Sequence, residues 1–230
     1  MKVRPLTREE VRGIDARAFD EFKMPTIVLM ENAGRGAAEW LRARLGGGQN
    51  QGRVVIACGP GNNGGDGGVV ARHLDAWGFN VLIAWFGDPT RLKGDAAIQR
   101  DILERSEIAR VVVKPDASPE AIEALWPASD WLVDALLGTG LTRPVEGLLA
   151  RAIASLNRSE RPILALDLPS GLDADSGQPL GEAVHATATA TFVAPKLGFA
   201  SDGAETYTGE VVVVDIGVPR ALLKPYLAAD

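Results

Sequence analysis

The feature of this sequence that most constrains its fold is the alternation of short apolar runs with segments of helical periodicity. Strand-like runs rich in β-branched residues occupy residues 53–58, 80–86, 109–113, 131–136, 163–168, 188–193 and 210–214. Helical patterns separate the first five of them, at residues 67–77, 94–106, 119–126 and 145–157. This order predicts βαβ units and a parallel sheet with helices on both faces. The last strands lack long helices between them and are expected to form an extension or an edge.

Two further helices are predicted before the first strand. Thr7 and Glu10 have the spacing of a capping box, and Val11, Ile14 and Ala18 follow at helical spacing until Pro25 ends the run. A second helix is expected from Thr26 to the glycine run that begins at Gly46. The whole chain, residues 1–230, reads as one α/β domain, and its apolar fraction of 46% is enough to fill a core.

Composition excludes several classes of protein. The net charge of −6 argues against nucleic-acid binding, which needs clustered Lys and Arg. No apolar stretch reaches the length of a membrane span, and the first residues lack the apolar core of a signal peptide. Because the single cysteine, Cys58, has no intrachain partner for a disulfide, a reducing compartment fits best. We therefore expect a cytoplasmic protein that binds neither membrane nor nucleic acid.

A glycine-rich segment at residues 59–67 follows the first predicted strand. Its Gly59, Gly61 and Gly64 match the G-x-G-x-x-G pattern of a nucleotide phosphate turn, in which backbone N–H groups approach an anion. Polar side chains also occupy this loop, where a plain phosphate turn needs only small residues. Asp66 in particular would face the negative charge of a bound phosphate, so the segment predicts a more specialised ligand site.

Two more strand ends carry unusual polar residues. Asp134 interrupts an apolar strand before Gly138-Thr139-Gly140, and Asp167 ends another before Pro169-Ser170-Gly171. A single Asp at such a place is usually a helix cap or a turn former. Here both lie in runs so apolar that burial is expected, and a buried carboxylate needs a partner or a metal. Because Asn63, Asp134 and Ser170 supply one carboxylate among neutral oxygens, they could surround a weakly charged hard cation. The glycines at 138 and 140 could hold phosphate or only end the strand.

Five motifs in order make the chain recognisable. Residues 29–34, 59–67, 134–140, 167–171 and 194–198 resemble the YjeF N-terminal family, which comprises NAD(P)H-hydrate epimerases. The resemblance covers nearly the whole chain. It implies a Rossmann-like three-layer αβα sandwich with a mainly parallel central sheet, one bound potassium ion (K+) per subunit and a homodimer. It also implies an isomerase that interconverts the R and S epimers of NADHX and NADPHX, nicotinamides hydrated at ring carbon 6, in nicotinamide nucleotide repair.

The same resemblance assigns roles to individual residues. Contacts with the hydrated dinucleotide fall to Asn62, Asn63, Gly64, Gly65 and Asp66. The phosphate-binding loop corresponds to Gly138, Thr139, Gly140, Leu141, Thr142, Arg143 and Pro144. Potassium ligands are Asn63, Asp134 and Ser170, and Asp167 contacts the substrate. The chemistry of the epimerisation, which needs a carboxyl that gives and recovers a proton, adds the hypothesis that Asp167 is the acid and base. Many bacterial members are fused to an ATP- or ADP-dependent dehydratase, an activity expected here in a separate polypeptide.

Two alternative functions and the position of one lysine side chain stay open at this point. An NAD-dependent oxidoreductase would use the glycine-rich loop, with Asp88 near the expected distance for a ribose-binding acid. A non-catalytic nucleotide-binding or scaffold module could share the fold without the chemistry. The side chain of Lys196 could approach a phosphate or the Asp167 carboxylate, or could lie solvated in a turn.

Overall fold

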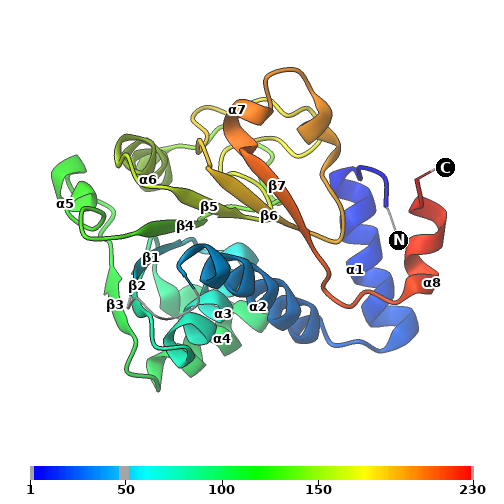
Figure 1. Cartoon of the computed structure of the whole chain (residues 1–230), viewed down its shortest axis with the longest axis horizontal. Helices are drawn as coiled ribbons and strands as arrows, with labels where there is room; N and C mark the ends of the chain where they lie inside the picture. The colour runs from blue at the N-terminus through cyan, green and yellow to red at the C-terminus, as the bar shows by residue number, and fades with distance from the viewer. Residues whose placement is uncertain (1–2, 47–51, 229–230) are drawn as a thin grey trace.

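The computed structural model describes residues 3–46 and 52–228, which build three layers around one seven-stranded sheet (Figure 1). The strand order is β3-β2-β1-β4-β5-β6-β7, and each neighbouring pair is parallel. The strands are β1 (Arg53–Cys58), β2 (Asn80–Trp85), β3 (Ala109–Val112), β4 (Trp131–Ala135), β5 (Ile163–Leu166), β6 (Ala188–Phe192) and β7 (Glu210–Val214). The predicted Rossmann-like αβα sandwich is thereby confirmed.

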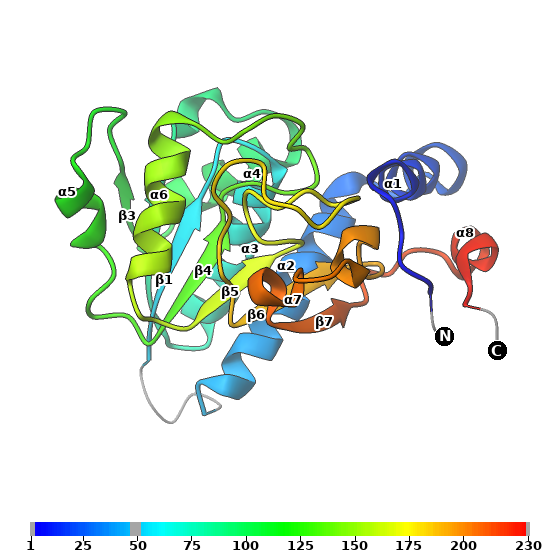
Figure 2. The same ribbon diagram turned by 90° about the horizontal axis from the view of Figure 1, so that it is seen from above.

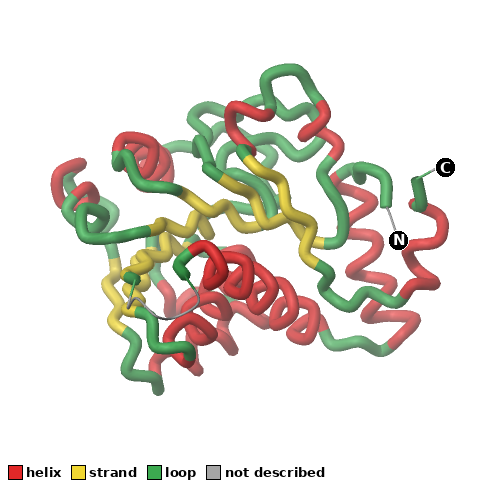
Figure 3. The backbone as a smooth tube through the Cα atoms, viewed as in Figure 1, coloured by secondary structure: helices red, strands yellow, loops and turns green. Residues whose placement is uncertain are grey.

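Helices cover both faces of the sheet, as Figures 1, 2 and 3 show. One face carries α2 (Thr26–Arg44), α3 (Asn62–Ala76) and α4 (Gly94–Glu104), and the other carries α5 (Pro119–Glu123) and α6 (Gly147–Arg158). Since side chains alternate along a strand, Val54 and Ile56 of β1 pack on the first face while Val55 and Ala57 pack on the second. Within the described ranges, no helix combines the length and the apolar character needed to cross a membrane.

All seven predicted strands are present, and five of them end one or two residues earlier than predicted. The chain turns sharply just after β5 and β6, where Asp167 and Val193 adopt left-handed φ angles of 67° and 68°. Strand geometry cannot continue through such residues. The last two strands extend the parallel sheet to its edge, joined by η2 (Leu197–Ala200) and the short helix α7 (Glu205–Thr208).

The glycine-rich segment corrects the sequence prediction. A helix was expected from residue 67, but α3 begins at Asn62, so most of the expected loop forms the first turns of a helix. Packing explains why glycines occur there despite their low helix propensity. A Cβ added to Gly64 would lie 2.2 Å from the Gly59 carbonyl oxygen, and one added to Gly67 would lie 2.7 Å from Ala135 Cβ. These glycines let α3 approach β1 and β4 closely.

The N-terminal helix α1 (Arg8–Phe22) stands at the carboxyl end of the sheet beside α8 (Arg220–Leu223) and η3 (Lys224–Tyr226) (Figure 1). Its capping box is confirmed, because Thr7 Oγ1 accepts the Glu10 N–H and the Glu10 carboxylate accepts the Thr7 N–H. The Arg8 N–H donates to Asp175 Oδ1 at 2.7 Å, and the Arg8 guanidinium pairs with Asp173. These contacts tie α1 to the loop after β5.

Candidate active site

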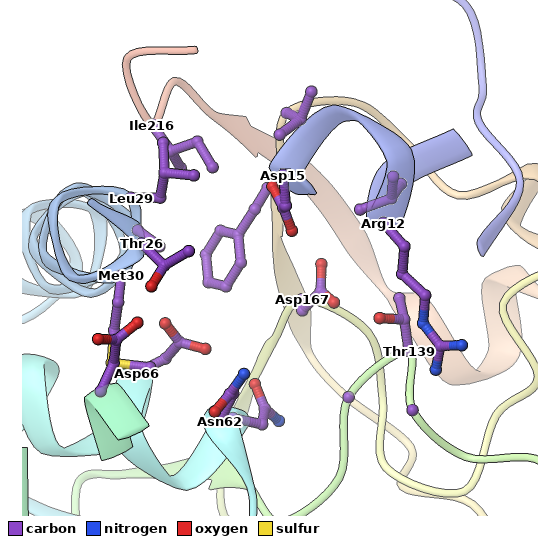
Figure 4. Close-up of a pocket in the computed structure, with 18 residues that line it drawn as sticks. Arg12, Asp15, Thr26, Leu29, Met30, Asn62, Asp66, Thr139, Asp167 and Ile216 are labelled. Carbon is purple, nitrogen blue, oxygen red and sulfur yellow. The ribbon is translucent and has the colours of Figure 1, made fainter. Parts of the chain in front are cut away.

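A cavity of about 430 Å³ opens at the carboxyl ends of the central strands, the edge where an open parallel sheet binds ligands (Figure 4). Its walls come from α1, α2, the first turns of α3, the start of α4, the segments after β4 and β5, and the end of β6. Within the described part of the chain, four carboxyl groups line it, those of Asp15, Asp66, Asp95 and Asp167. A site this acidic differs from a plain phosphate pocket and suits proton transfer.

The start of α3 presents polar side chains to the cavity. Asn62, Asn63 and Asp66 line it, whereas Gly64 and Gly65 are not among the lining residues. A Cβ on Gly65 would lie 2.8 Å from the Met30 side chain, so this glycine serves close helix packing. Among the residues that the structure describes, no side chain caps the first turn of α3, and an uncapped helix N-terminus favours an anion. The contacts predicted for Gly64 and Gly65 with a dinucleotide stay predictions.

Asp66 is the most deeply buried of the cavity acids. Burial raises its pKa well above the usual range, and the neighbouring carboxyls of Asp167, Asp15 and Asp95 raise it further. The raised pKa favours the neutral, protonated form of Asp66, which weakens the repulsion between this side chain and a bound phosphate that the sequence suggested.

Asp134 and Ser170 lie fully buried behind the cavity rather than on its wall. Ser170 Oγ donates to Asp134 Oδ1 at 2.6 Å, and the Ser170 N–H donates to Asp134 Oδ2 at 2.8 Å. Burial raises the pKa of Asp134 to about 6, although these hydrogen bonds lower it. Asn63 adjoins this pair, because its Nδ2 and Ser170 Oγ both lie within hydrogen-bond distance of the Leu137 carbonyl. The three residues predicted as ligands are thus brought to one place.

The buried Lys196 and the partly buried Asp167 form an ion pair at the cavity wall. Lys196 Nζ lies 2.5 Å from Asp167 Oδ1 and also donates to Thr191 Oγ1 at 2.9 Å and to the Phe192 carbonyl at 3.2 Å. The lysine is completely buried, so of the three open interpretations the structure selects the Asp167 contact. The other carboxylate oxygen, Oδ2, faces Gly138, since a Cβ there would lie 3.7 Å away. Lys196 therefore holds one oxygen of Asp167 and leaves the second toward the cavity.

Sequence reasoning missed Asp15 and Asp95, which both line the cavity. Asp15 follows the buried Ile14 and lies four residues after the buried Val11, so it belongs to the inward side of α1. An acid at that position of an amphipathic helix was the available signal. Burial, with the Asp167 carboxyl adding to it, raises the pKa of Asp15 to about 6, and Lys196 opposes this shift.

This pKa predicts a stabilising substitution. The folded state favours the protonated form of Asp15. The stabilisation that comes from this protonation is complete below the unfolded-state pKa near 3.8 and is lost as the pH rises through about 6. At pH 7.5 the ionised carboxyl costs roughly 1–3 kcal/mol. We expect Asp15→Asn to raise the melting temperature by a few degrees at pH 7.5 and to leave it unchanged at pH 4.

Differential scanning calorimetry of this variant at both pH values measures the effect. Asp20→Asn is the matched control, because Asp20 is exposed on the same helix. If Asp15→Asn raises the melting temperature equally at pH 4 and pH 7.5, the ionised carboxyl is not the source of the lost stability.

The predicted phosphate loop divides in two. Gly138, Thr139 and Gly140 line the cavity, whereas the side chain of Leu141 packs on the core beneath α6 and those of Thr142, Arg143 and Pro144 are exposed outside the lining. Phosphate contacts of these last four residues stay predictions.

The oxidoreductase alternative loses its ribose-binding acid. Asp88 is exposed and caps η1 (Pro89–Arg91), where its Oδ1 accepts the Thr90 N–H at 2.9 Å and the Thr90 hydroxyl at 2.6 Å. Hydrogen bonds from Thr90 lower the pKa of this carboxyl. Asp88 is also absent from the lining of the cavity, so its role in the structure is local capping.

Known proteins resemble this chain along nearly its whole length. The model of the family "YjeF-related protein N-terminus" matches residues 26–198. An NAD(P)H-hydrate epimerase of Rhodopirellula baltica is 44% identical over 98% of this chain and 89% of its own length. One from Pirellula staleyi is also 44% identical, over 94% of each chain.

Two other relatives add context. A bifunctional NAD(P)H-hydrate repair enzyme of Moorella thermoacetica is 37% identical over 95% of this chain, which spans 41% of that longer protein. The crystal structure of yeast ynu0 shares the fold, with a TM-score of 0.74 and 22% identity over 85% of this chain and 83% of the yeast chain. On the family match and the identity along nearly its whole length, this chain belongs to the family of YjeF-related protein N-termini.

Proposed function

We propose that this protein is an NAD(P)H-hydrate epimerase, an isomerase that interconverts the R and S epimers of NADHX and NADPHX. Two relatives of that name share 44% of its residues over nearly the whole chain. The observation that carries the proposal is the arrangement of the Asp167 carboxylate. One of its oxygens pairs with the buried Lys196, and the other faces a cavity of about 430 Å³. A silent scaffold needs no such acid in a pocket.

The chemistry requires little beyond a proton donor and acceptor. Ring carbon 6 of the substrate bears a hydroxyl group and is bonded to the ring nitrogen. When a carboxyl protonates the hydroxyl, water leaves with the bonding electrons, and the nitrogen lone pair forms a C=N bond. Water then adds to the other face and returns a proton to a carboxylate. Asp167 gives or takes the proton on the ring face that it reaches, as acid in one direction and as base in the other, and Lys196 fixes its orientation.

The rest of the dinucleotide fits the neighbouring walls. We place its diphosphate between the uncapped N-terminus of α3 and the Gly138-Thr139-Gly140 turn, because both present backbone N–H groups and small residues. Asn62 lines the same part of the cavity and can donate through its amide. The nicotinamide then lies toward Asp167.

Potassium is the proposed cofactor, one ion per subunit, held by Asn63, Asp134 and Ser170. The residues fit it, because Asn63 Oδ1 is buried and has no hydrogen-bond partner among the described residues. An unpaired buried amide oxygen is costly, and a cation beside it removes that cost. One carboxylate among neutral oxygens suits a monovalent ion better than a divalent one. When bound, the ion supplies positive charge beside the diphosphate.

This proposal predicts a potassium effect on binding. Replacing potassium with tetramethylammonium is expected to weaken NADP+ binding about tenfold, or roughly 1.4 kcal/mol, while the circular dichroism spectrum stays the same. Titration calorimetry measures the affinity. Asn63→Ala should bind NADP+ weakly in both buffers, because the orphaned oxygen is gone. Equal affinity of the wild type with and without potassium overturns the proposed cation site.

A coupled assay tests the function directly. The purified protein and a separate S-specific, ATP- or ADP-dependent dehydratase are given a mixture of both NADHX epimers. The dehydratase alone should consume the S epimer and leave the R epimer to decay at its slow spontaneous rate, whereas adding this chain should drive complete consumption. Heat-inactivated chain is the control. If the R epimer persists with active chain present, the proposed function is wrong.

Such a dehydratase is also the proposed functional partner, which the bifunctional repair enzymes among the relatives support. The proposal keeps the homodimer and the cytoplasmic location that the family resemblance implies. Size-exclusion chromatography with light scattering tests the dimer.

A further inference from the structure

Epimerisation by loss and return of water needs proton transfer on both faces of the nicotinamide ring. The hydroxyl leaves from one face, and the inverted product forms only if water adds to the opposite face. Lys196 holds Asp167 by one oxygen and so fixes its position at one wall. A carboxyl fixed in this way serves one face, so the proposed function on which this inference rests calls for a second group.

Asp15 occupies the position that such a group requires. It reaches the cavity from α1, an element far from Asp167 in the sequence, and Figure 4 shows the two carboxyls directed toward one another. The helix is held in place by the ion pair of Arg8 with Asp173 and by the buried side chains of Val11 and Ile14. The position of Asp15 is thus built into the fold.

The two carboxyls have different environments. Asp167 is paired with the buried Lys196, whereas the Asp15 carboxyl takes part in no hydrogen bond or ion pair within the described parts of the chain. The charged groups around Asp15 are those of Asp167, Lys196 and the other charged lining residues among those described, Arg12, Asp66 and Asp95. With its pKa raised to about 6 by burial and by Asp167, Asp15 exchanges protons readily near neutral pH. Two carboxyls kept in unlike environments are a known arrangement of acid and base.

We propose that Asp15 is the second catalytic residue of the epimerisation and transfers protons on the ring face opposite to the face that Asp167 serves. In one direction, the Asp15 carboxyl protonates the hydroxyl on carbon 6, the C–O bond breaks, and water leaves with the electron pair. The ring nitrogen forms a C=N bond. Water then bonds to carbon 6 from the Asp167 side, gives its proton to Asp167, and the C=N electron pair returns to nitrogen. The reverse direction exchanges the two roles.

Exchange of the carbon 6 oxygen with oxygen-18 water distinguishes the roles of Asp15 and Asp167. Asp15→Asn is expected to lower the rate of inversion at least roughly 100-fold. It should still exchange the carbon 6 oxygen, with retention, in the one epimer whose hydroxyl faces Asp167. Asp167→Asn should show the complementary pattern and exchange only the other epimer. A merely structural role for Asp15 slows exchange in both epimers together, and that outcome overturns the proposal.

Further variants keep the result interpretable. Asp15→Glu should recover part of the inversion rate, and the exposed Asp20→Asn should keep the wild-type rate. Binding of NADP+ by titration calorimetry confirms that each variant is folded. If Asp66→Asn, instead of Asp15→Asn, gives the one-epimer exchange, the role belongs to Asp66 and the proposal fails. If the wild type inverts neither epimer, the proposed function itself is wrong. If the wild type is active and Asp15→Asn inverts as fast, only the proposed role of Asp15 is wrong.

Discussion

Replacing Asp167 with asparagine is expected to lower kcat for epimerisation by about 10²- to 10⁴-fold, because an amide cannot give and recover a proton. Asparagine has nearly the same shape, and it tolerates the left-handed φ of 67° at this position better than most residues do. The backbone turn after β5 should therefore survive. Purified R-NADHX and chromatographic separation of the epimers measure the rate.

Stability needs a separate control, because the substitution leaves a fully buried ammonium without its carboxylate. The free energy of unfolding of Asp167→Asn should fall by about 3 kcal/mol. In the double variant Asp167→Asn/Lys196→Met both charges are gone, and we expect most of that loss to be recovered while activity stays low. Wild-type turnover in Asp167→Asn, or activity that returns in the double variant, contradicts a proton-transfer role for Asp167.

Replacing Gly59 with alanine is expected to prevent the protein from folding stably, with a loss of more than about 4 kcal/mol. The added Cβ would lie 1.8 Å from the Leu136 carbonyl oxygen and 2.6 Å from its carbon. Both neighbours belong to the backbone, and no side-chain rotation relieves the overlap. The segments that follow β1 and β4 would have to separate, although the Gly59 N–H donates to the Ala135 carbonyl at 2.9 Å between them.

Gly61→Ala is the matched control from the same motif. A Cβ on Gly61 meets nothing within 4 Å, and the cost of alanine at this helix N-cap is about 1 kcal/mol. Urea unfolding, or the soluble yield where Gly59→Ala does not purify, compares the two variants. If both variants lose a similar amount of stability, general glycine flexibility, instead of the close contact of Gly59 with Leu136, explains why glycine is needed in this motif.

The strands and their parallel order were predictable because burial on both faces of a sheet leaves long runs of apolar, β-branched residues. The start of α3 was not. Asn62 to Gly67 have poor helix propensity, and their helix depends on close contact with β1 and β4, which no local pattern reports. Tertiary packing here overrides the preference of the individual residues.

The residues of the candidate site also fall into those that local sequence patterns predict and those that depend on tertiary contacts. Asp134 and Asp167 were found because ligands bind outside the carboxyl ends of parallel strands, and both residues interrupt or end such strands. Asp15 was missed because its place in the cavity depends on how α1 docks, through contacts such as Arg8 with Asp173 that join distant parts of the chain. The partner of Lys196 stayed open for the same reason.

The docking of α1 has a consequence for the order in which the enzyme becomes active during synthesis. This first helix packs against α8, and the Arg4 N–H donates to the Tyr226 carbonyl at 2.9 Å. A nascent chain can complete its central strands long before α8 leaves the ribosome, but the wall that carries Asp15 gains its final support only then. The earliest helix to be made is thus among the last to settle, and catalytic competence should appear later than the sheet.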